Sequence, residues 1–445
     1  MEKCLETSFP AKQSYSIESF MQMEKTTTMN SAKIEKPETR HKPRVLMVTH
    51  VLPCPPAAGN EIRIYKLLMW FKKSGYRVTL VLKPLNDDEE VPNQCILGLR
   101  TLVEDIHVFD NRVVSYSSLR VAGSVIPYLD LNDVDTKLKN VQDMFCPPWF
   151  AAEVERIAGE IRPDVVIAQY VFMSRILTLP GCLPSLKIID AHDLFCRKQA
   201  TVEQYGIRNY NLSLTEQQER SLLLRADVVL AIQAEEQEEI MRIVTERRIL
   251  MTSIDLDVRT CDPRKMNPGQ VLIVASSNEF NIRGTQDFID YTWPLVRETD
   301  SSVRLRVIGR VCQYVRSDDP SISLLGFVEN LAEEYEKAEV VINPCRVGTG
   351  IKIKTIEALS FGKAHVAWPS AADGLRDIGY VPMIIATNVV EFADSILSIL
   401  SNSIKREILE AKAYRFIEEH FCMERVYASL ASEIDGVTSR QKRVA

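Results

Sequence analysis

The sequence predicts an α/β protein built from two domains with parallel sheets, and three observations support this. Its 445 residues are enough for two domains with complete hydrophobic cores. Short continuous apolar runs, which are typical of strands buried on both faces of a parallel sheet, alternate with segments of helical periodicity. This alternation occurs in both halves of the chain, although we find no internal sequence repeat.

Composition and charge exclude several classes of protein. The hydrophobic share of 46% and charged share of 26% are those of a globular protein, and a net charge of −6 argues against a nucleic-acid partner. The ten cysteines form no Cys-x-x-Cys pair, which argues against zinc and for a reducing compartment. No apolar run approaches the ~20 residues of a membrane-spanning helix, and the N-terminus lacks the apolar core of a secretory signal.

The order of these segments predicts five regions. The N-terminal region is polar and aperiodic, and prolines mark the connection between the two domains. We expect a disordered or poorly packed extension (1–42), an N-terminal Rossmann-like domain (43–246), an interdomain connection (247–269) and a C-terminal Rossmann-like domain (270–403). A C-terminal helix that packs back on the first domain, followed by a basic tail, completes the chain (404–445).

The first domain opens with a βαβ unit. Arg44–His50 is a buried strand, Leu52–Glu61 is a loop stiffened by prolines, and a helix ending at Ser74-Gly75 leads to a second strand at Arg77–Leu82. Further strands are predicted at Asp105–Phe109, Val165–Gln169, Lys187–Asp190 and Ala226–Ile232, and helices at Ala151–Ile161, Glu216–Arg225 and Gln233–Ile243. Residues 111–150 are hard to interpret, and we expect helices there that border a cleft.

The second domain repeats the pattern. Strands are predicted at Val271–Ala275, Val303–Gly309, Ile322–Gly326, Glu339–Ile342 and Ala364–Trp368, and helices at Phe288–Val296, Val389–Leu400 and 404–435.

The stretch Asn343–Leu359 is the strongest functional signal. A buried strand leads through a loop with Gly348 and Gly350 into a helix, so backbone N–H groups and the helix N-terminus suit an anion such as phosphate. Lys352 and Lys354 add positive charge, and Glu357 is placed to accept hydrogen bonds from sugar hydroxyls. Together they indicate a site for a nucleotide diphosphate sugar; the alternative is an ordinary solvated loop followed by a surface glutamate.

This stretch resembles the donor-binding element of retaining GT-B glycosyltransferases of the group 1 type, which include glycogen and sucrose synthases and bacterial polysaccharide enzymes. One branch carries Gly-x-Gly-x-Lys/Arg-x-Lys-x-x-Glu-Ala, and Gly348–Ala358 fits it throughout. The resemblance covers residues 44 to 420, most strongly after 270, and implies two Rossmann-like domains that face each other across a cleft. It also implies that the N-terminal domain (43–246) lies on the acceptor side and that the C-terminal domain (270–403) binds the nucleotide sugar. In one departure, Thr349 stands where the family often has a glutamate that contacts the donor sugar; in another, Asp373 replaces a glutamate of a downstream motif.

The resemblance also implies roles for residues of the first domain. Asp190, His192 and Asp193 match an Asp-x-His-Asp motif whose histidine contacts the donor sugar, and we take His192 as the catalytic candidate. Gly59 matches a loop glycine close to the donor phosphates and the acceptor. The alternatives are a structural histidine for His192 and a turn that leads into a helix for Gly59.

A further cation of the donor site is implied after the first strand of the second domain. Arg283-Gly284 matches a Lys-Gly pair whose lysine contacts the diphosphate. Ser277 or Asn278 occupies the place of an arginine that also contacts it, so one cation is missing. The alternative for Arg283 is a plain surface arginine.

The predicted reaction is therefore the transfer of a sugar from a nucleotide diphosphate sugar to a saccharide or lipid-linked acceptor, with retention at the anomeric carbon. We expect no metal and no cofactor, because the sequence has no Asp-x-Asp pair of the metal-binding type and the lysines, Arg283 and the helix N-terminus can neutralise the leaving diphosphate. We expect the protein in the cytoplasm, either free or bound peripherally at the inner face of the membrane. Two alternatives stay open: a nucleotide-sugar 2-epimerase and a non-catalytic module that binds sugar or a partner.

Overall fold

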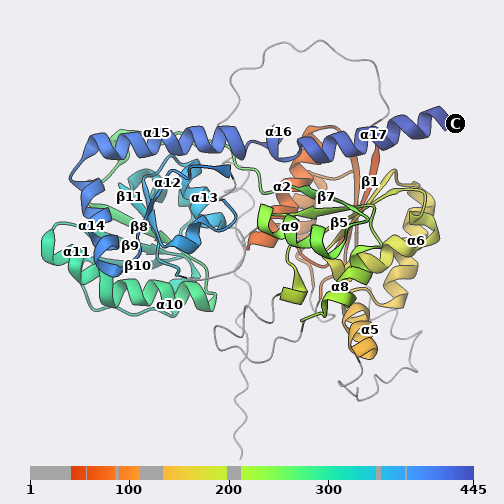
Figure 1. The fold of residues 1–445 in the computed structure, drawn as a ribbon, viewed down its shortest axis with the longest axis horizontal. Coiled ribbons are helices and arrows are strands. Elements are labelled where there is room, and N and C mark those ends of the chain that lie inside the picture. Colours follow the sequence, from red (N-terminus) through yellow and green to blue (C-terminus); the bar gives the residue numbers. More distant parts are fainter. Residues whose placement is uncertain are drawn as a thin grey trace, which may run out of the picture.

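The structure is a computed structural model that describes residues 42–56, 58–85, 90–110, 134–197, 212–346, 352–375 and 378–444. Two parallel sheets, each covered by helices, account for the two halves of the chain (Figure 1). The predicted α/β class is thus confirmed.

The first sheet has seven strands in the order β3-β2-β1-β4-β5-β6-β7, all paired in parallel. The order reverses between β1 and β4, which makes a topological switch point at the carboxyl edge of the sheet. The strands are β1 (Arg44–Thr49), β2 (Arg77–Leu82), β3 (Asp105–Val108), β4 (Val165–Gln169), β5 (Leu186–Asp190), β6 (Val228–Ala231) and β7 (Arg248–Met251).

Helices cover both faces of this sheet. The α-helices are α2 (Gly59–Lys73), α3 (Asn93–Arg100), α5 (Val134–Phe145), α6 (Pro148–Ile161), α8 (Glu216–Leu223) and α9 (Ala234–Ile243), and two 3₁₀ segments follow β4, η1 (Val171–Thr178) and η2 (Pro180–Cys182). Part of the segment 111–150, in which we expected helices bordering a cleft, lies outside the described residues; its remainder forms α5 and the start of α6.

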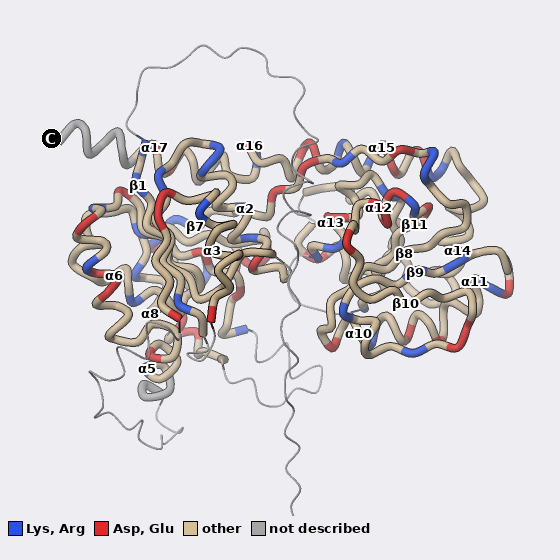
Figure 2. Tube along the Cα trace, turned by 180° about the vertical axis from the view of Figure 1, so that it is seen from behind, with Lys and Arg blue, Asp and Glu red and all other residues tan. Residues whose placement is uncertain are grey.

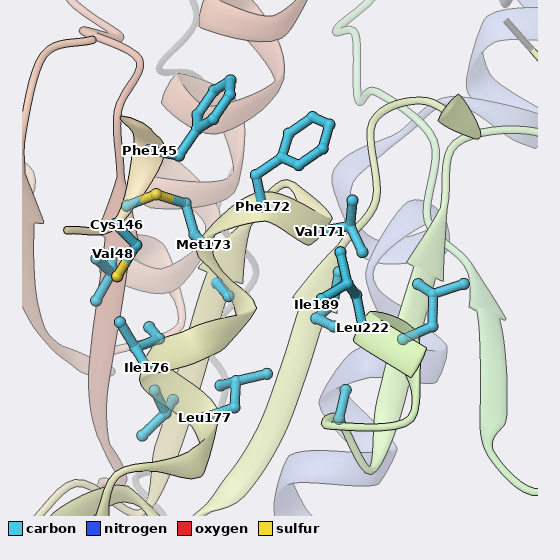
Figure 3. Packing of buried hydrophobic residues seen from close by; sticks show 14 of the residues in the cluster. Val48, Phe145, Cys146, Val171, Phe172, Met173, Ile176, Leu177, Ile189 and Leu222 are labelled. Atoms are coloured by element: carbon cyan, nitrogen blue, oxygen red, sulfur yellow. The ribbon is translucent and has the colours of Figure 1, made fainter. Parts of the chain in front are cut away.

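Successive side chains along the strands of the first sheet point to opposite faces, and each face forms its own hydrophobic core. Val45 and Met47 of β1 point to a cluster with α2 and α17, whereas Leu46 and Val48 point to a cluster with α6 and η1. Figure 3 shows the second cluster, in which Val48 and Ile189 meet aromatic and aliphatic side chains of α5, η1 and α8.

The second sheet has six parallel strands in the order β10-β9-β8-β11-β12-β13, with its own switch point between β8 and β11. The strands are β8 (Gln270–Val274), β9 (Arg304–Ile308), β10 (Ile322–Gly326), β11 (Val340–Asn343), β12 (His365–Ala367) and β13 (Ile384–Ile385). The helices are α10 (Glu279–Asp287), a π-helical turn η4 (Phe288–Thr292), α11 (Trp293–Thr299), α12 (Leu331–Lys337), α13 (Ile353–Ser360) and α14 (Val389–Leu400), with short 3₁₀ turns η3 (Pro263–Lys265), η5 (Arg310–Gln313) and η6 (Pro369–Ala372).

Local sequence explains where several of these helices begin and end. The side chains of four asparagines accept a first-turn N–H and so cap α10, α12, α14 and α15. Helix α13 is followed by Gly362 with φ of +62°, a conformation that favours glycine. The capping asparagines are Asn278, Asn330, Asn388 and Asn402.

The C-terminal segment links both halves. Helices α15 (Ser403–His420), α16 (Met423–Val426) and α17 (Ala428–Val444) run one after another along the same side of both sheets (Figure 1). Phe416 of α15 packs with the second half, whereas Leu430 and Ile434 of α17 join the core of the first sheet. We had predicted a single helix over 404–435; the structure breaks it around Phe421.

Two further differences concern the strands. The predicted connection 247–269 contains β7, which extends the first sheet, so the chain leaves that sheet only after Met251. The short strand β13 was not predicted.

Charged residues of both signs are interspersed along both halves of the chain (Figure 2). No helix within the described ranges combines the length and the apolar character needed to cross a membrane.

Candidate active site

The two halves of the chain meet at the starts of helices. A Cβ atom added to Gly59, the first residue of α2, would lie 2.8 Å from Cδ1 of Ile353, the first residue of α13. Nearby in the fold, the N–H of Gly374 donates to Oε1 of Glu235 in the first turn of α9, at 3.2 Å. These residues follow the carboxyl ends of β1, β11, β12 and β6, so the carboxyl edges of the two sheets face each other, where α/β proteins bind ligands.

Helix α13 offers the better anion site of the two facing helix starts. Its first turn contains no acidic residue, so its N–H groups and helix dipole are not offset by a carboxylate on the same turn. The first turn of α2, in contrast, carries Glu61, which accepts the N–H of Ala58 at 2.9 Å. Gly348 and Gly350, which we predict to contact the phosphates, lie outside the described residues.

Lys352 stands directly before α13. It is partly buried, and burial lowers the pKa of its ammonium group, while the carboxylate of Asp373 acts in the opposite direction. A lysine in such a position is placed to neutralise an anion at the helix start.

Glu357 lies one turn further along α13 and is held as a carboxylate. Its side chain is 17% exposed, and its Oε2 accepts hydrogen bonds from Lys354 Nζ at 2.8 Å and from the Tyr335 hydroxyl at 3.0 Å. Burial favours protonation, but the charges of Lys354 and Arg259 outweigh it and hold the pKa of Glu357 below its usual value. Lys354, which we predicted to contact the donor, is thus engaged with Glu357 and fixes an acceptor suited to sugar hydroxyls.

Gly284 places α10 against the strand end that leads into the glycine loop. A Cβ added to Gly284 would lie 2.6 Å from Pro344 O and 2.9 Å from Cys345 Cα, so only glycine allows this approach. Arg283 itself is exposed on the same helix. Asn278, at the place of the expected second cation, instead caps α10 by accepting the N–H of Asn281 at 2.8 Å.

His192 lies at the carboxyl edge of the first sheet, just past β5. Its side chain is only 3% exposed, and its ring stacks on Tyr170 with centroids 4.1 Å apart. Its Nε2 lies 2.6 Å from Gln169 Oε1 and 3.6 Å from Asp190 Oδ2. Burial lowers the pKa of His192 to about 4, although Asp190 acts in the opposite direction, so the imidazole is neutral near pH 7.

The predicted site residues therefore fall into two groups. Gly59, Lys352, Lys354 and Glu357 converge at the start of α13, with Arg283 held beside the same loop by Gly284, whereas His192 is on the opposite sheet edge. No hydrogen bond or ion pair joins His192 to the second half within the part of the chain that the structure describes.

Several residues of this region were not predicted. Arg63, Gln169 and Tyr170 surround His192 and its neighbour Asp190, and Tyr335 holds Glu357. Two of these residues have a sequence signal that could have indicated them: Arg63 is a charged residue on the apolar side of a helix, and Gln169 is a polar residue that ends a buried strand. Among the described residues, no three His, Cys, Asp or Glu side chains gather in a possible metal site.

Comparison with known proteins agrees with this geometry. Residues 268–402 match the family model described as "Glycosyl transferases group 1". An uncharacterized 44.6 kDa protein in the cps region of Klebsiella pneumoniae is 22% identical over 164 residues, which are 34% of this chain and 42% of that protein. The chain thus spans less than half the length of the curated relative that it matches.

Similarity to solved structures extends over nearly the whole chain. HepE of Anabaena, in complex with UDP and glucose, has 12% identity over 88% of this chain and 100% of its own, with a TM-score of 0.61. Sucrose-phosphate synthase of Thermosynechococcus elongatus has 13% identity over 90% and 100%, with a TM-score of 0.58. A variant of S. aureus TarM, in complex with fondaparinux, α-GlcNAc-glycerol and UDP, has 12% identity over 88% and 99%, with a TM-score of 0.59.

These similarities confirm the predicted GT-B fold, in which two Rossmann-like units meet at their carboxyl edges. The residues that match the group 1 family model, 268–402, include Lys352 and Glu357.

Proposed function

We propose that this protein is a glycosyltransferase that moves a sugar from a nucleotide diphosphate sugar to a saccharide or lipid-linked acceptor, with retention of configuration. The observation that carries the proposal is the contact of Gly59 with the start of α13, where Lys352 stands. This contact supports the proposal because it brings the two halves together beside the start of α13, where a donor held between two domains would need them.

Each residue then has a role in transfer. The start of α13, Lys352 and Arg283 hold the diphosphate and stabilise the charge that develops on it as the sugar leaves. Glu357, held by Tyr335 and Lys354, accepts hydrogen bonds from sugar hydroxyls of the nucleotide sugar. His192 orients the sugar ring, the leaving phosphate helps to deprotonate the acceptor hydroxyl, and no metal takes part.

The relatives support the choice of substrates. HepE is described in complex with UDP and glucose, and TarM in complex with UDP and α-GlcNAc-glycerol. The Klebsiella relative is described as lying in a cps region, so we propose polysaccharide assembly as the setting. UDP and UDP-sugars are therefore the first probes to use.

One observation favours a second candidate. Thr349 replaces a glutamate that contacts the donor sugar in the family, which suits a non-catalytic module that binds the donor without transfer. Incubation with a panel of nucleotide sugars and oligosaccharide acceptors, read by mass spectrometry, separates the two. Transfer or donor hydrolysis supports the glycosyltransferase, whereas binding of a nucleotide sugar without any turnover supports the module.

A further inference from the structure

Three polar side chains meet at the carboxyl edge of the first sheet. Gln169 ends β4 and Asp190 ends β5, and the register of the two strands places them directly opposite each other. His192 follows two residues later, with its Nε2 2.6 Å from the Gln169 amide oxygen and 3.6 Å from the Asp190 carboxylate. The neutral amide, and not the acid, is therefore the hydrogen-bond partner of the imidazole.

Arg63 explains why Asp190 does not take that place. Its Nε lies 2.9 and 3.1 Å from the two carboxylate oxygens of Asp190, and its Nη2 lies 2.6 Å from Oδ1. Its Nη1 donates to the backbone carbonyls of Thr252 and Ser253. Arg63 is 3% and Asp190 1% exposed, so this bidentate pair is buried and already balances the charge of the carboxylate.

The ring of His192 is also fixed in orientation. It stacks on Tyr170 with an interplanar angle of 6°, and both residues have positive φ, 61° for His192 and 68° for Tyr170. Such backbone conformations are costly for residues other than glycine and persist only where the surroundings enforce them. With Nε2 bound to Gln169, Nδ1 is the nitrogen left for a ligand.

We propose that Gln169 and Arg63 are positioning residues that keep His192 neutral with its proton on Nε2, so that Nδ1 accepts a hydrogen bond from a sugar hydroxyl. The part that concerns the sugar rests on the proposed glycosyltransferase function. Gln169 supplies the acceptor that fixes the tautomer. Arg63 pairs with the Asp190 carboxylate, which would otherwise stabilise the protonated form of His192.

The other titratable groups near the ring are compatible with this arrangement. His50 lies at the end of β1, and burial lowers its pKa to about 3, so it adds no positive charge. Asp193 follows in the same loop and favours protonation of His192, while Arg63 opposes it. Glu236 on α9 faces Asp193, Arg63 and Asp190, and burial raises its pKa to about 7.

The test is nitrogen NMR of histidine-labelled protein, with the His192 signals assigned by their loss in His192→Asn. We expect the Nε2–H tautomer in the wild type, without protonation from about pH 8 to about pH 5. Gln169→Glu places a carboxylate beside Nε2 and should raise the pKa of His192 by more than about one unit. Gln169→Met, the uncharged control, should leave the ring neutral and free it to change tautomer.

Two Arg63 variants test whether Arg63 keeps His192 neutral by pairing with Asp190. Arg63→Gln frees the Asp190 carboxylate and should raise the pKa of His192, whereas the double variant Arg63→Gln/Asp190→Asn removes both charges and should restore it. The double variant keeps the charge balance of the buried site, so it remains informative if the single variant is poorly folded.

Two results would overturn the proposal. One is an Nδ1–H tautomer of His192 in the wild type, which would form if the amide group of Gln169 had the reversed orientation. The other is a pKa of His192 that is the same in Gln169→Glu as in Gln169→Met. In an active enzyme, Gln169→Glu should also lose turnover on the acid side of its pH profile, while Gln169→Met should show a flat profile. Because the NMR measurement needs no substrate, its failure is distinct from failure of the nucleotide-sugar panel.

Discussion

The close approach of α10 to the start of the glycine loop can be tested with Gly284→Ala. The added Cβ would lie 2.6 Å from Pro344 O, 2.9 Å from Cys345 Cα and 3.1 Å from Pro344 C. All three are backbone atoms, so no side-chain rotation relieves the overlap. Either α10 or the segment from Pro344 to Cys345 must therefore move.

Two opposing effects determine how much Gly284→Ala changes the free energy of unfolding. Replacing glycine by alanine inside a helix is favourable by about 1 kcal/mol, whereas forcing an extra group into a packed site costs about 1–3 kcal/mol. Gly159 in α6 provides a matched control, because a Cβ there would meet nothing within 4 Å and only the favourable term applies. We expect the free energies of unfolding of the two variants to differ by about 1–3 kcal/mol, with Gly159→Ala the more stable.

The assay combines urea unfolding with calorimetric titration of UDP. Gly284→Ala should unfold at a lower urea concentration than Gly159→Ala and should bind UDP more weakly, because the displaced segment leads into the predicted phosphate loop. Equal stabilisation by both substitutions, together with unchanged UDP affinity in Gly284→Ala, would refute the reasoning.

Three further predictions concern the site. His192→Ala should lower kcat and kcat/KM together by about 10²-fold, because the interaction acts mainly in the transition state; a variant with a lower melting temperature and a normal single-turnover rate would make His192 a scaffold residue. Tyr335→Phe removes one hydrogen bond to Glu357 and should weaken UDP binding by about 0.5–1.5 kcal/mol, and an unchanged dissociation constant would show that Glu357 does not depend on it. Turnover should survive EDTA, since positive side chains and a helix start replace the metal; loss of activity that Mg²⁺ or Mn²⁺ restores would contradict this.

Much of the fold could be predicted because buried parallel strands read as apolar runs. Val45–Val48 and Val271–Val274 are such runs and lie in the centres of the two sheets. Strand β7 was missed because its apolar run, Ile249–Met251, is only three residues long and follows two arginines, as an edge strand allows. Its position depends on pairing with β6, which no local pattern reveals.

Some residues of the candidate site could likewise be predicted from the sequence, whereas others could not. Gly59, Lys352 and Glu357 could be predicted as site residues because each belongs to a short local pattern around a strand end or helix start. Arg63 was missed because its partner Asp190 is 127 positions away in the chain. Such a contact forms only when α2 packs on the first sheet, so sequence periodicity cannot indicate it.

The central claim, that the start of α13 binds the donor diphosphate, is tested most directly by calorimetric titration of nucleoside diphosphates, UDP first, into three proteins. Wild type should bind, and Lys352→Ala should bind more weakly by about 1.5–3 kcal/mol through loss of a charge-assisted contact. Lys405→Ala, which alters a lysine bonded to Ser398 on α14, should match wild type. Equal affinity of wild type and Lys352→Ala would contradict the account.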